Sequence, residues 1–165
     1  THRQSSAASD VYKRQKNTSF KITAKLFIPE GGAEGMIITQ GGWFAGWGLM
    51  LLEGKPTFKY SLSHYPEHKH TIKGKNVLPA GDHTLVADFD YEGGGVGKGA
   101  TVTLLLNGEE VAKGNIPATV PTRFSMTEGL DVGRDAGLPL TKDYDVPFRF
   151  TGKIGKVVVT LEGEE

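Results

Sequence analysis

Four aspartates fall in one short region of the chain that also contains glycines and prolines. They are Asp131, Asp135, Asp143 and Asp145. Carboxylate and carbonyl oxygens on loops are the ligands that Ca²⁺ prefers, so this pattern suits a calcium site. A second interpretation stays open, in which the same carboxylates cap turns and pair with neighbouring cations, namely Arg134, Lys142 and Arg149.

Three aromatic residues lie among glycines in the segment 41–48. Trp47 begins an apolar run and is therefore expected in the core. Trp43 and Phe44 are the better surface candidates, because they precede that run. Exposed rings can stack on the apolar faces of sugars, or they can pack against a partner domain, since exposed apolar patches often mark partner surfaces. We favour the domain interface over the sugar site.

Two further motifs invite a chemical interpretation. His64, His68 and His70 could bind a transition metal, but no accompanying carboxylate pattern can be recognised, and we expect an exposed loop. The glycine-rich run 92–101 resembles a phosphate loop. It has Glu92 and Gly99 where the motif requires Gly and Ser or Thr, and an apparent strand follows it instead of a helix. We therefore expect a turn there.

Composition excludes several classes of function. The chain has 165 residues, no cysteine, and 19 basic against 19 acidic side chains, for a formal net charge of +0. Disulfides and thiolate chemistry are therefore absent. No net field attracts nucleic acid or an anionic membrane surface, and no apolar run approaches the roughly 20 residues of a membrane span. We expect neither nucleic acid nor membrane as a partner.

Short alternating segments separated by turns dominate the rest of the chain. Phe20, Ile22, Ala24 and Leu26 share one face of a period-two pattern, which is typical of a half-buried strand. Asn107-Gly108 between two such segments indicates a hairpin. The 23 glycines and 8 prolines punctuate these segments, and no long amphipathic helix is evident. The segments expected as strands are 19–28, 35–40, 47–52, 56–61, 71–73, 83–91, 101–106, 110–116, 124–126, 130–133 and 153–161.

Such closely spaced strands predict an all-β fold with two packed antiparallel sheets. A single domain over residues 17–165 suits this length. Residues 1–16 have a different character, being polar and without apolar periodicity. The stretch SAASDVYKRQ within them resembles translated adapter or library sequence found at the ends of assembled environmental genes. We expect residues 1–16 to be foreign or disordered and to carry no function.

Several motifs resemble the concanavalin A-like, laminin-G-type jelly-roll family. They are GWGL at 46–49 with EGK at 53–55, PAGDHTL at 79–85, LNGE at 106–109, VGR at 132–134 and FTGKI at 150–154. The resemblance implies a two-sheet antiparallel jelly-roll sandwich, and domains of this type often hold a calcium ion in their loops.

A narrower resemblance links the chain to the C-terminal region of bacterial arylsulfatases. It rests on DFDYEGGGVGKG at 88–99, DVGRDAG at 131–137 and DYDVPF at 143–148, and it extends over roughly 17–162. It implies a bacterial parent protein, with this sandwich as an accessory domain that follows a sulfatase catalytic domain, its expected partner. The cellular compartment stays open.

The catalytic chemistry of that family cannot be carried over. Its motif, C/S-x-P-x-R, supplies a Cys or Ser that is oxidised to formylglycine. The nearest string is TVPTR at 119–123, and the methyl group on Cβ of threonine prevents formation of the aldehyde. We therefore predict a non-catalytic domain without catalytic residues of its own. The alternative is a lectin-like module for sulfated glycans. A glycosidase of the same fold ranks last, because it needs two inward carboxylates about 5–9.5 Å apart and the E-x-D-x-x-E strand motif is absent.

Overall fold

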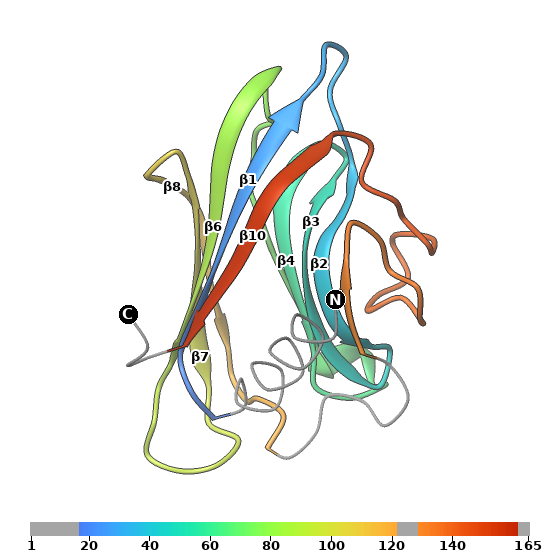
Figure 1. The fold of residues 1–165 in the computed structure, drawn as a ribbon. Helices are drawn as coiled ribbons and strands as arrows, with labels where there is room; N and C mark the ends of the chain where they lie inside the picture. Colours follow the sequence, from blue (N-terminus) through green and yellow to red (C-terminus); the bar gives the residue numbers. More distant parts are fainter. Residues whose placement is uncertain (1–16, 122–128, 162–165) are drawn as a thin grey trace, which may run out of the picture.

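The computed structural model describes residues 17–121 and 129–161, which form two five-stranded antiparallel sheets (Figure 1). Sheet A consists, in spatial order, of β10 (Lys153–Leu161), β1 (Phe20–Ile28), β6 (Gly81–Tyr91), β7 (Ala100–Leu106) and β8 (Glu109–Ile116). Sheet B consists of β5 (Lys69–Lys73), β4 (Lys55–Ser61), β3 (Ala45–Leu52), β2 (Gly35–Gly42) and β9 (Leu130–Val132). The predicted all-β, two-sheet antiparallel sandwich is therefore confirmed.

The strand predictions hold with small shifts of their ends. β5 begins at Lys69 instead of Thr71, and β6 begins at Gly81 instead of His83. The only helix among the described residues is the single 3-10 turn η1 (Pro66–His68), and no helix in this part of the chain is long and apolar enough to cross a membrane. The predicted strand 124–126 and the segment 1–16 lie outside the described residues.

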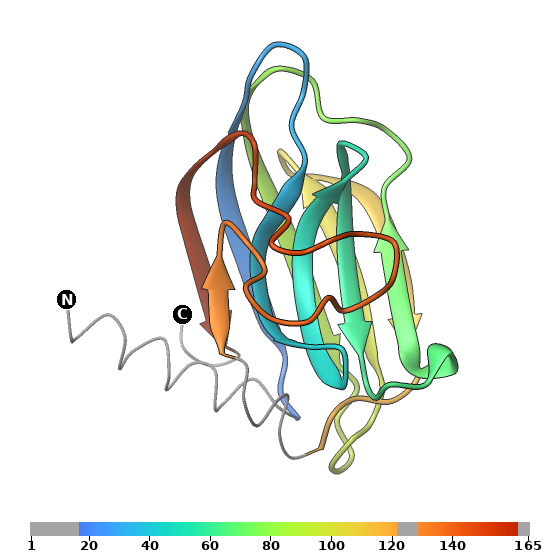
Figure 2. The same ribbon diagram turned by 90° about the vertical axis from the view of Figure 1, so that its right-hand side faces the viewer.

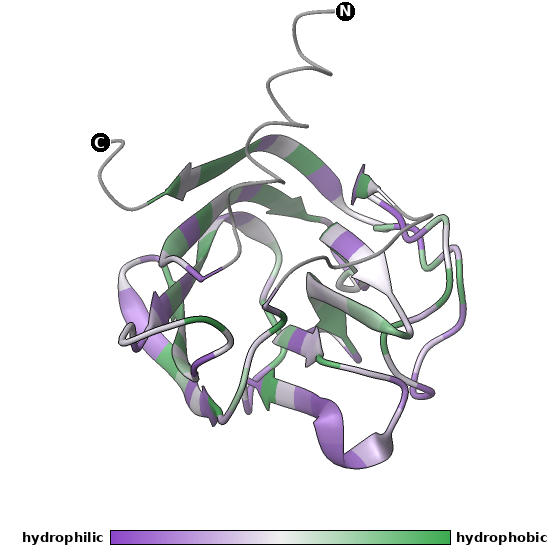
Figure 3. Cartoon of the chain, turned by 90° about the horizontal axis from the view of Figure 1, so that it is seen from below, coloured by the Kyte–Doolittle hydropathy of each residue, from purple (hydrophilic) through white to green (hydrophobic). Residues whose placement is uncertain are grey.

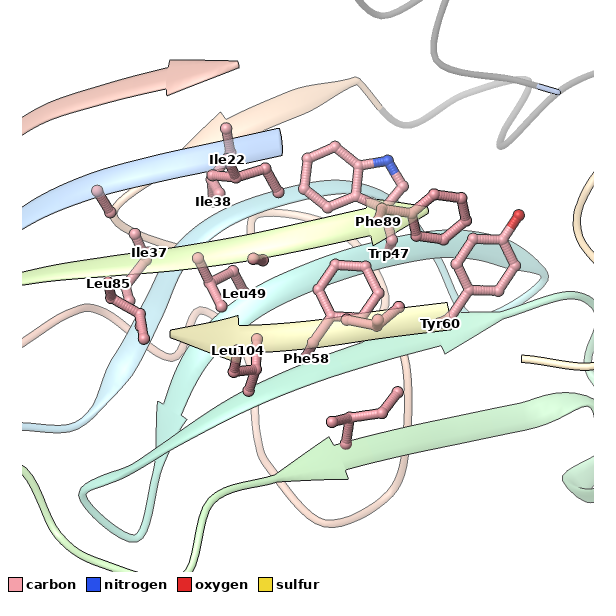
Figure 4. Packing of buried hydrophobic residues seen from close by; sticks show 14 of the residues in the cluster. Ile22, Ile37, Ile38, Trp47, Leu49, Phe58, Tyr60, Leu85, Phe89 and Leu104 are labelled. Carbon is pink, nitrogen blue, oxygen red and sulfur yellow. The ribbon is translucent and has the colours of Figure 1, made fainter. Parts of the chain in front are cut away.

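The main core lies between the inner faces of the two sheets. Figure 3 shows the two sheets from below, coloured by hydropathy, and Figure 4 shows the buried side chains at close range. Aromatic rings fill one part of it. The rings of Phe20 and Phe89 stack at 4.5 Å, those of Trp47 and Phe58 at 6.3 Å, and those of Tyr60 and Phe89 at 5.8 Å between centroids. Such offset pairs add to the energy of apolar burial. Trp47 is fully buried, as its apolar run predicts.

A second, smaller core lies on the outer face of sheet B. Residues 133–152, which we call the strap, connect β9 to β10 and cross this face (Figure 2). The strap residues Leu140 and Tyr144 pack there on side chains of β2 and β3, namely Met36, Met50 and Leu52. Sheet B is thus covered on both faces, which explains why β2 is buried along its whole length.

Glycine is required where the strap approaches most closely. Gly35 has φ +118°, and a Cβ added there would lie 2.3 Å from the carbonyl oxygen of Arg149. A side chain at this position would therefore push the strap away from the start of β2.

Candidate functional site

The β2–β3 turn carries the two aromatic residues expected at the surface. Phe44 is 62% exposed and Trp43 is half-buried. The turn is tight, because Gly41 and Gly46 face each other across it and a Cβ on either would collide with the opposite backbone. The glycines around these rings thus hold Trp43 and Phe44 at the tip of a hairpin.

The β4–β5 connection brings further rings beside this turn. The imidazole of His64 lies 6.0 Å from the ring of Phe44 and 4.2 Å from the ring of Tyr65, measured between centroids. Tyr65 is 52% exposed. We call Trp43, Phe44, His64 and Tyr65 the aromatic patch. Sequence reasoning identified the first two as surface aromatics, and the second two became evident only with the structure.

Lys69 holds the aromatic patch in place through its contacts with Trp43. The ammonium group of Lys69 lies 3.8 Å from the centre of the Trp43 indole. It donates hydrogen bonds to the carbonyl oxygens of Trp43 at 2.6 Å and Leu140 at 2.8 Å and to Ser61 Oγ at 2.9 Å. Burial lowers the pKa of Lys69 to about 8. Lys69 thus ties the β2–β3 turn, β4 and the strap together.

The three histidines do not form a metal site. Nδ1 of His68 is hydrogen-bonded to Ser63 Oγ at 2.7 Å. His70 lies on β5 instead of in the loop, and burial followed by the charge of His68 lowers its pKa. Within residues 17–121 and 129–161, no three His, Cys, Asp or Glu side chains form a group that could hold a metal ion.

The four aspartates expected to bind calcium are likewise not brought together as such a group. Asp131 accepts a hydrogen bond from the Ala136 amide at 2.9 Å, and Asp145 is exposed. Asp135 is almost fully buried and accepts a hydrogen bond from the Tyr144 hydroxyl at 2.8 Å. Asp131 and Asp135 thus hold turns of the strap region, which agrees with the turn-capping part of the second interpretation above. Calcium binding stays a prediction, with no set of three ligands to carry it.

The fourth aspartate has a partner that sequence reasoning missed. Asp143 forms a 2.9 Å ion pair with Lys59, whose side chain is 1% exposed beneath the strap. Lys59 also donates to Thr71 Oγ1 at 2.9 Å. The expected partners were cations of the strap itself. The sequence did contain a signal for the burial of Lys59. The continuous apolar run of β3 predicts that sheet B is covered on both faces, and Lys59 lies on β4, the strand next to β3.

Desolvation and pairing act in opposite directions on these two groups. Burial lowers the pKa of Lys59, although Asp143 works against this. Burial alone would raise the pKa of Asp143, but hydrogen bonds from Thr141 and Lys59 and the lysine charge hold it below its usual value. Burial also raises the pKa of Tyr144, followed by the charge of Asp135, so Tyr144 stays a neutral hydrogen-bond donor.

The glycine-rich run between β6 and β7 is a folded loop without the geometry of a phosphate site. The Glu92 amide donates to the Gly99 carbonyl at 2.9 Å, which closes the loop. Tyr91 donates to the carbonyl of Gly95 and accepts from the Lys98 amide. Strand β7 follows the loop. Thr119, from the string that resembles a sulfatase motif, donates to the Lys98 carbonyl at 2.6 Å and so ties this loop in place.

Comparison with protein-family models and with curated proteins gives no match. Among solved structures, the fold resembles domains LG4-5 of the mouse laminin alpha1 chain, at 15% identity and a TM-score of 0.58. The match covers 88% of this chain and 37% of that one. The chain thus spans well under half of the laminin structure.

A second similar structure is the CBM40 of the Ruminococcus gnavus IT-sialidase, at 16% identity and a TM-score of 0.60. The match covers 93% of this chain and 79% of that one. The same CBM40 has been solved bound to alpha2,3 sialyllactose, and that structure matches at 14% identity, a TM-score of 0.59, and 94% and 79% coverage. Together with the two packed sheets, these matches define the fold as a concanavalin A-like, laminin-G-type jelly roll.

Proposed function

We propose that this chain is a non-catalytic accessory sandwich of an arylsulfatase-like sulfuric ester hydrolase and that its aromatic patch packs against the catalytic domain. The observation that carries the proposal is the exposure of two neighbouring aromatic side chains, Phe44 at 62% and Tyr65 at 52%, at one end of the sandwich. Large exposed rings in one patch are typical of an interface with a partner.

The structural roles of the arylsulfatase-like motifs support a non-catalytic domain. Asp143 and Tyr144 belong to the motif at 143–148. Asp143 pairs with Lys59 of β4 and Tyr144 packs on β2 and β3, so both fasten the strap to sheet B. Asp135, from the motif at 131–137, accepts a hydrogen bond from the Tyr144 hydroxyl. Tyr91 and the glycines of the motif at 88–99 form a closed loop. These structural roles of the motif residues support the proposal that the chemistry belongs to another domain.

A second candidate function is carbohydrate binding, because the structurally similar CBM40 has been solved bound to alpha2,3 sialyllactose. The aromatic patch favours it as well, because Lys142 Nζ lies 5.9 Å from the Trp43 ring centre. A ring beside a flexible cation suits a sulfated sugar, whose apolar face stacks on the ring while its sulfate pairs with the ammonium group.

The first proposal is tested in the parent protein that carries a sulfatase domain before this one. We expect Phe44→Ser with Tyr65→Ser to lower the temperature at which aryl sulfate hydrolysis is lost, while the melting temperature of the 165-residue chain alone stays unchanged. Val96→Ser is the matched control, because Val96 is 65% exposed on the glycine-rich loop. An unchanged inactivation temperature, or aryl sulfate turnover by the chain alone, would refute this proposal.

The second candidate is tested with an array of sulfated and neutral glycans. It predicts binding by the 165-residue chain that Trp43→Ala abolishes and Val96→Ser retains. An array without binding removes this candidate and leaves the domain interface unaffected, so the two functions are separated by experiment.

A further inference from the structure

A groove of about 510 Å³ lies on sheet A, away from the aromatic patch. It crosses the region where β10 begins and β1 ends, at the upper end of the sandwich in Figure 1, whereas the β2–β3 turn lies at the lower end. Its lining includes Lys25 and Phe27 of β1, Lys153 of β10 and Asp82 of β6. The strap, which covers sheet B, does not contribute to this lining.

Register places the lining side chains in two adjacent rows. Phe27 lies between Lys153 on one neighbouring strand and Asp82 on the other. Lys25, two residues earlier and on the same face, lies between Lys156 and Thr84. Lys25 and Lys153 therefore line the β1–β10 side of the groove, Lys156 lies next to this lining, and the lining has a single aspartate, Asp82, on the far side.

A β-bulge opens this part of the sheet. Lys25 pairs with Lys156 and Leu26 pairs with Ile154, so Gly155 is the extra residue of β10. Gly155 lines the groove and has no side chain to fill it. Bulges re-aim neighbouring side chains and are common beside binding sites.

The lysines of the groove are available to a ligand. Lys25, Lys153 and Lys156 are exposed, and within the described part of the chain none of their ammonium groups forms an ion pair. Lys153 Nζ lies 5.8 Å from the ring centre of Phe27, which is itself 41% exposed. The groove thus presents an open aromatic ring with positive charge beside it.

The far wall is polar and held in position. Asn107 Oδ1 accepts from the Thr84 amide at 2.8 Å, and Asn107 Nδ2 lies 2.9 Å from His83 Nδ1. His83 Nε2 lies 2.7 Å from the Pro79 carbonyl oxygen. This fixed wall loses little conformational entropy when it binds a ligand.

From this arrangement we infer that the groove binds an anionic saccharide. The ring of Phe27 matches the apolar face of a sugar, Lys25 and Lys153 match a sulfate or carboxylate group, and Asp82 with Asn107 matches hydroxyl groups, which both donate and accept. A nucleic acid would suit the lysines but not the aspartate. This inference is independent of the proposed domain interface, since it concerns the other end of the sandwich.

The test measures binding of three hexasaccharides to the 165-residue chain by calorimetry: chondroitin sulfate, oligogalacturonate and neutral cellohexaose. We expect one or both anionic probes to bind and cellohexaose not to bind. Binding of chondroitin sulfate alone identifies sulfate as the anion, and binding of oligogalacturonate identifies the carboxylate. Absence of binding by both anionic probes overturns the inference.

Charge-reversed variants locate the site. Lys25→Glu and Lys153→Glu are each expected to weaken binding by about tenfold. The matched control is Lys113→Glu, which makes the same charge change at an exposed residue of β8 outside the groove lining, and it is expected to leave affinity within about twofold. Equal weakening by all three variants, or equal affinity for a short DNA duplex, would show a general attraction for polyanions and overturn the inference.

A substitution of the ring separates a saccharide from a free anion. Phe27→Ala is expected to weaken hexasaccharide binding, and the fold tolerates it because the side chain lies at the surface of sheet A. Unchanged melting temperatures of all variants confirm that they are folded. Hexasaccharide affinity that is unaffected by Phe27→Ala, or is lost with Phe44→Ser instead, would place the ligand elsewhere and contradict the inference.

Discussion

Substitution of Asp143 by alanine should destabilise the fold, because it removes the only acidic partner of Lys59 in the described structure. The Lys59 side chain is 1% exposed and its ammonium group lies 2.9 Å from Asp143 Oδ2. Breaking a buried pair by removing one partner typically costs about 3–5 kcal/mol. The Asp143 side chain is itself 52% exposed, so water screens part of this interaction, and we expect a loss of about 2 kcal/mol.

Substitution of the other partner, Lys59, should have a smaller effect on the free energy of unfolding. Lys59→Met keeps most of the side-chain volume and leaves a carboxylate that water can hydrate, so we expect a change within about 1 kcal/mol. In the double variant the two effects should not add, and its stability should equal that of Lys59→Met alone. The coupling energy from this cycle isolates the ion pair.

Urea unfolding followed by tryptophan fluorescence measures all four free energies of unfolding. Asp145→Ala serves as control, because Asp145 is exposed and lies two residues away, and it should change stability by less than about 0.5 kcal/mol. If Asp143→Ala is as stable as the original chain, or if the two single effects add, Lys59 does not depend on Asp143 and the proposed fastening of the strap is wrong.

Three further predictions concern the strap and the turns. The pKa of Asp143 is lower in the folded state, so its contribution to folding stability is fully present above the ordinary carboxyl range and is lost as pH falls through the folded pKa. The stability difference between the original chain and Asp143→Ala should therefore shrink below about pH 4 in acid unfolding. A difference that stays constant with pH would contradict this prediction. Tyr144→Phe should cost about 1–3 kcal/mol in urea unfolding, since it removes the hydroxyl that serves a buried carboxylate and the Leu140 amide; an unchanged midpoint refutes this. Gly35→Ala should cost more than about 2 kcal/mol, because its Cβ would meet backbone at 2.3 Å, whereas Gly108→Ala, with φ +88° and open space, should cost about 1 kcal/mol; equal effects would show that strain alone acts.

Local patterns in the sequence were sufficient to predict the sandwich. The alternation in β1 places Phe20 and Ile22 in the core, as observed. Asn107 and Gly108 adopt φ values of 52° and 88°, as the turn of a two-residue hairpin requires. Such signals work because they depend on side chains within a few residues of each other.

The strap could not be predicted, because it has no periodicity and its contacts join distant parts of the chain. Lys59 and Asp143 are 84 residues apart, and although the apolar run of β3 indicates that Lys59 on β4 becomes buried, no local pattern shows which residue covers it. The positions of the four aspartates were therefore interpreted from their loop location alone. The structure places Asp131, Asp135 and Asp143 in separate hydrogen bonds.

The aromatic patch was predicted in part. Trp43 and Phe44 were identified because they precede an apolar run, whereas His64 and Tyr65 were assigned only to a loop. A usable signal was present. In a meander of β2, β3, β4 and β5, every second connection lies at the same end of the sheet, so the β4–β5 connection had to lie beside the β2–β3 turn.

Whether this sandwich serves a neighbouring sulfatase domain, as we propose, can be decided by sequencing the encoding gene upstream of the codon for Asn17. We expect an open reading frame that continues into a sulfatase domain with a C/S-x-P-x-R motif. A different catalytic domain in that frame would contradict it.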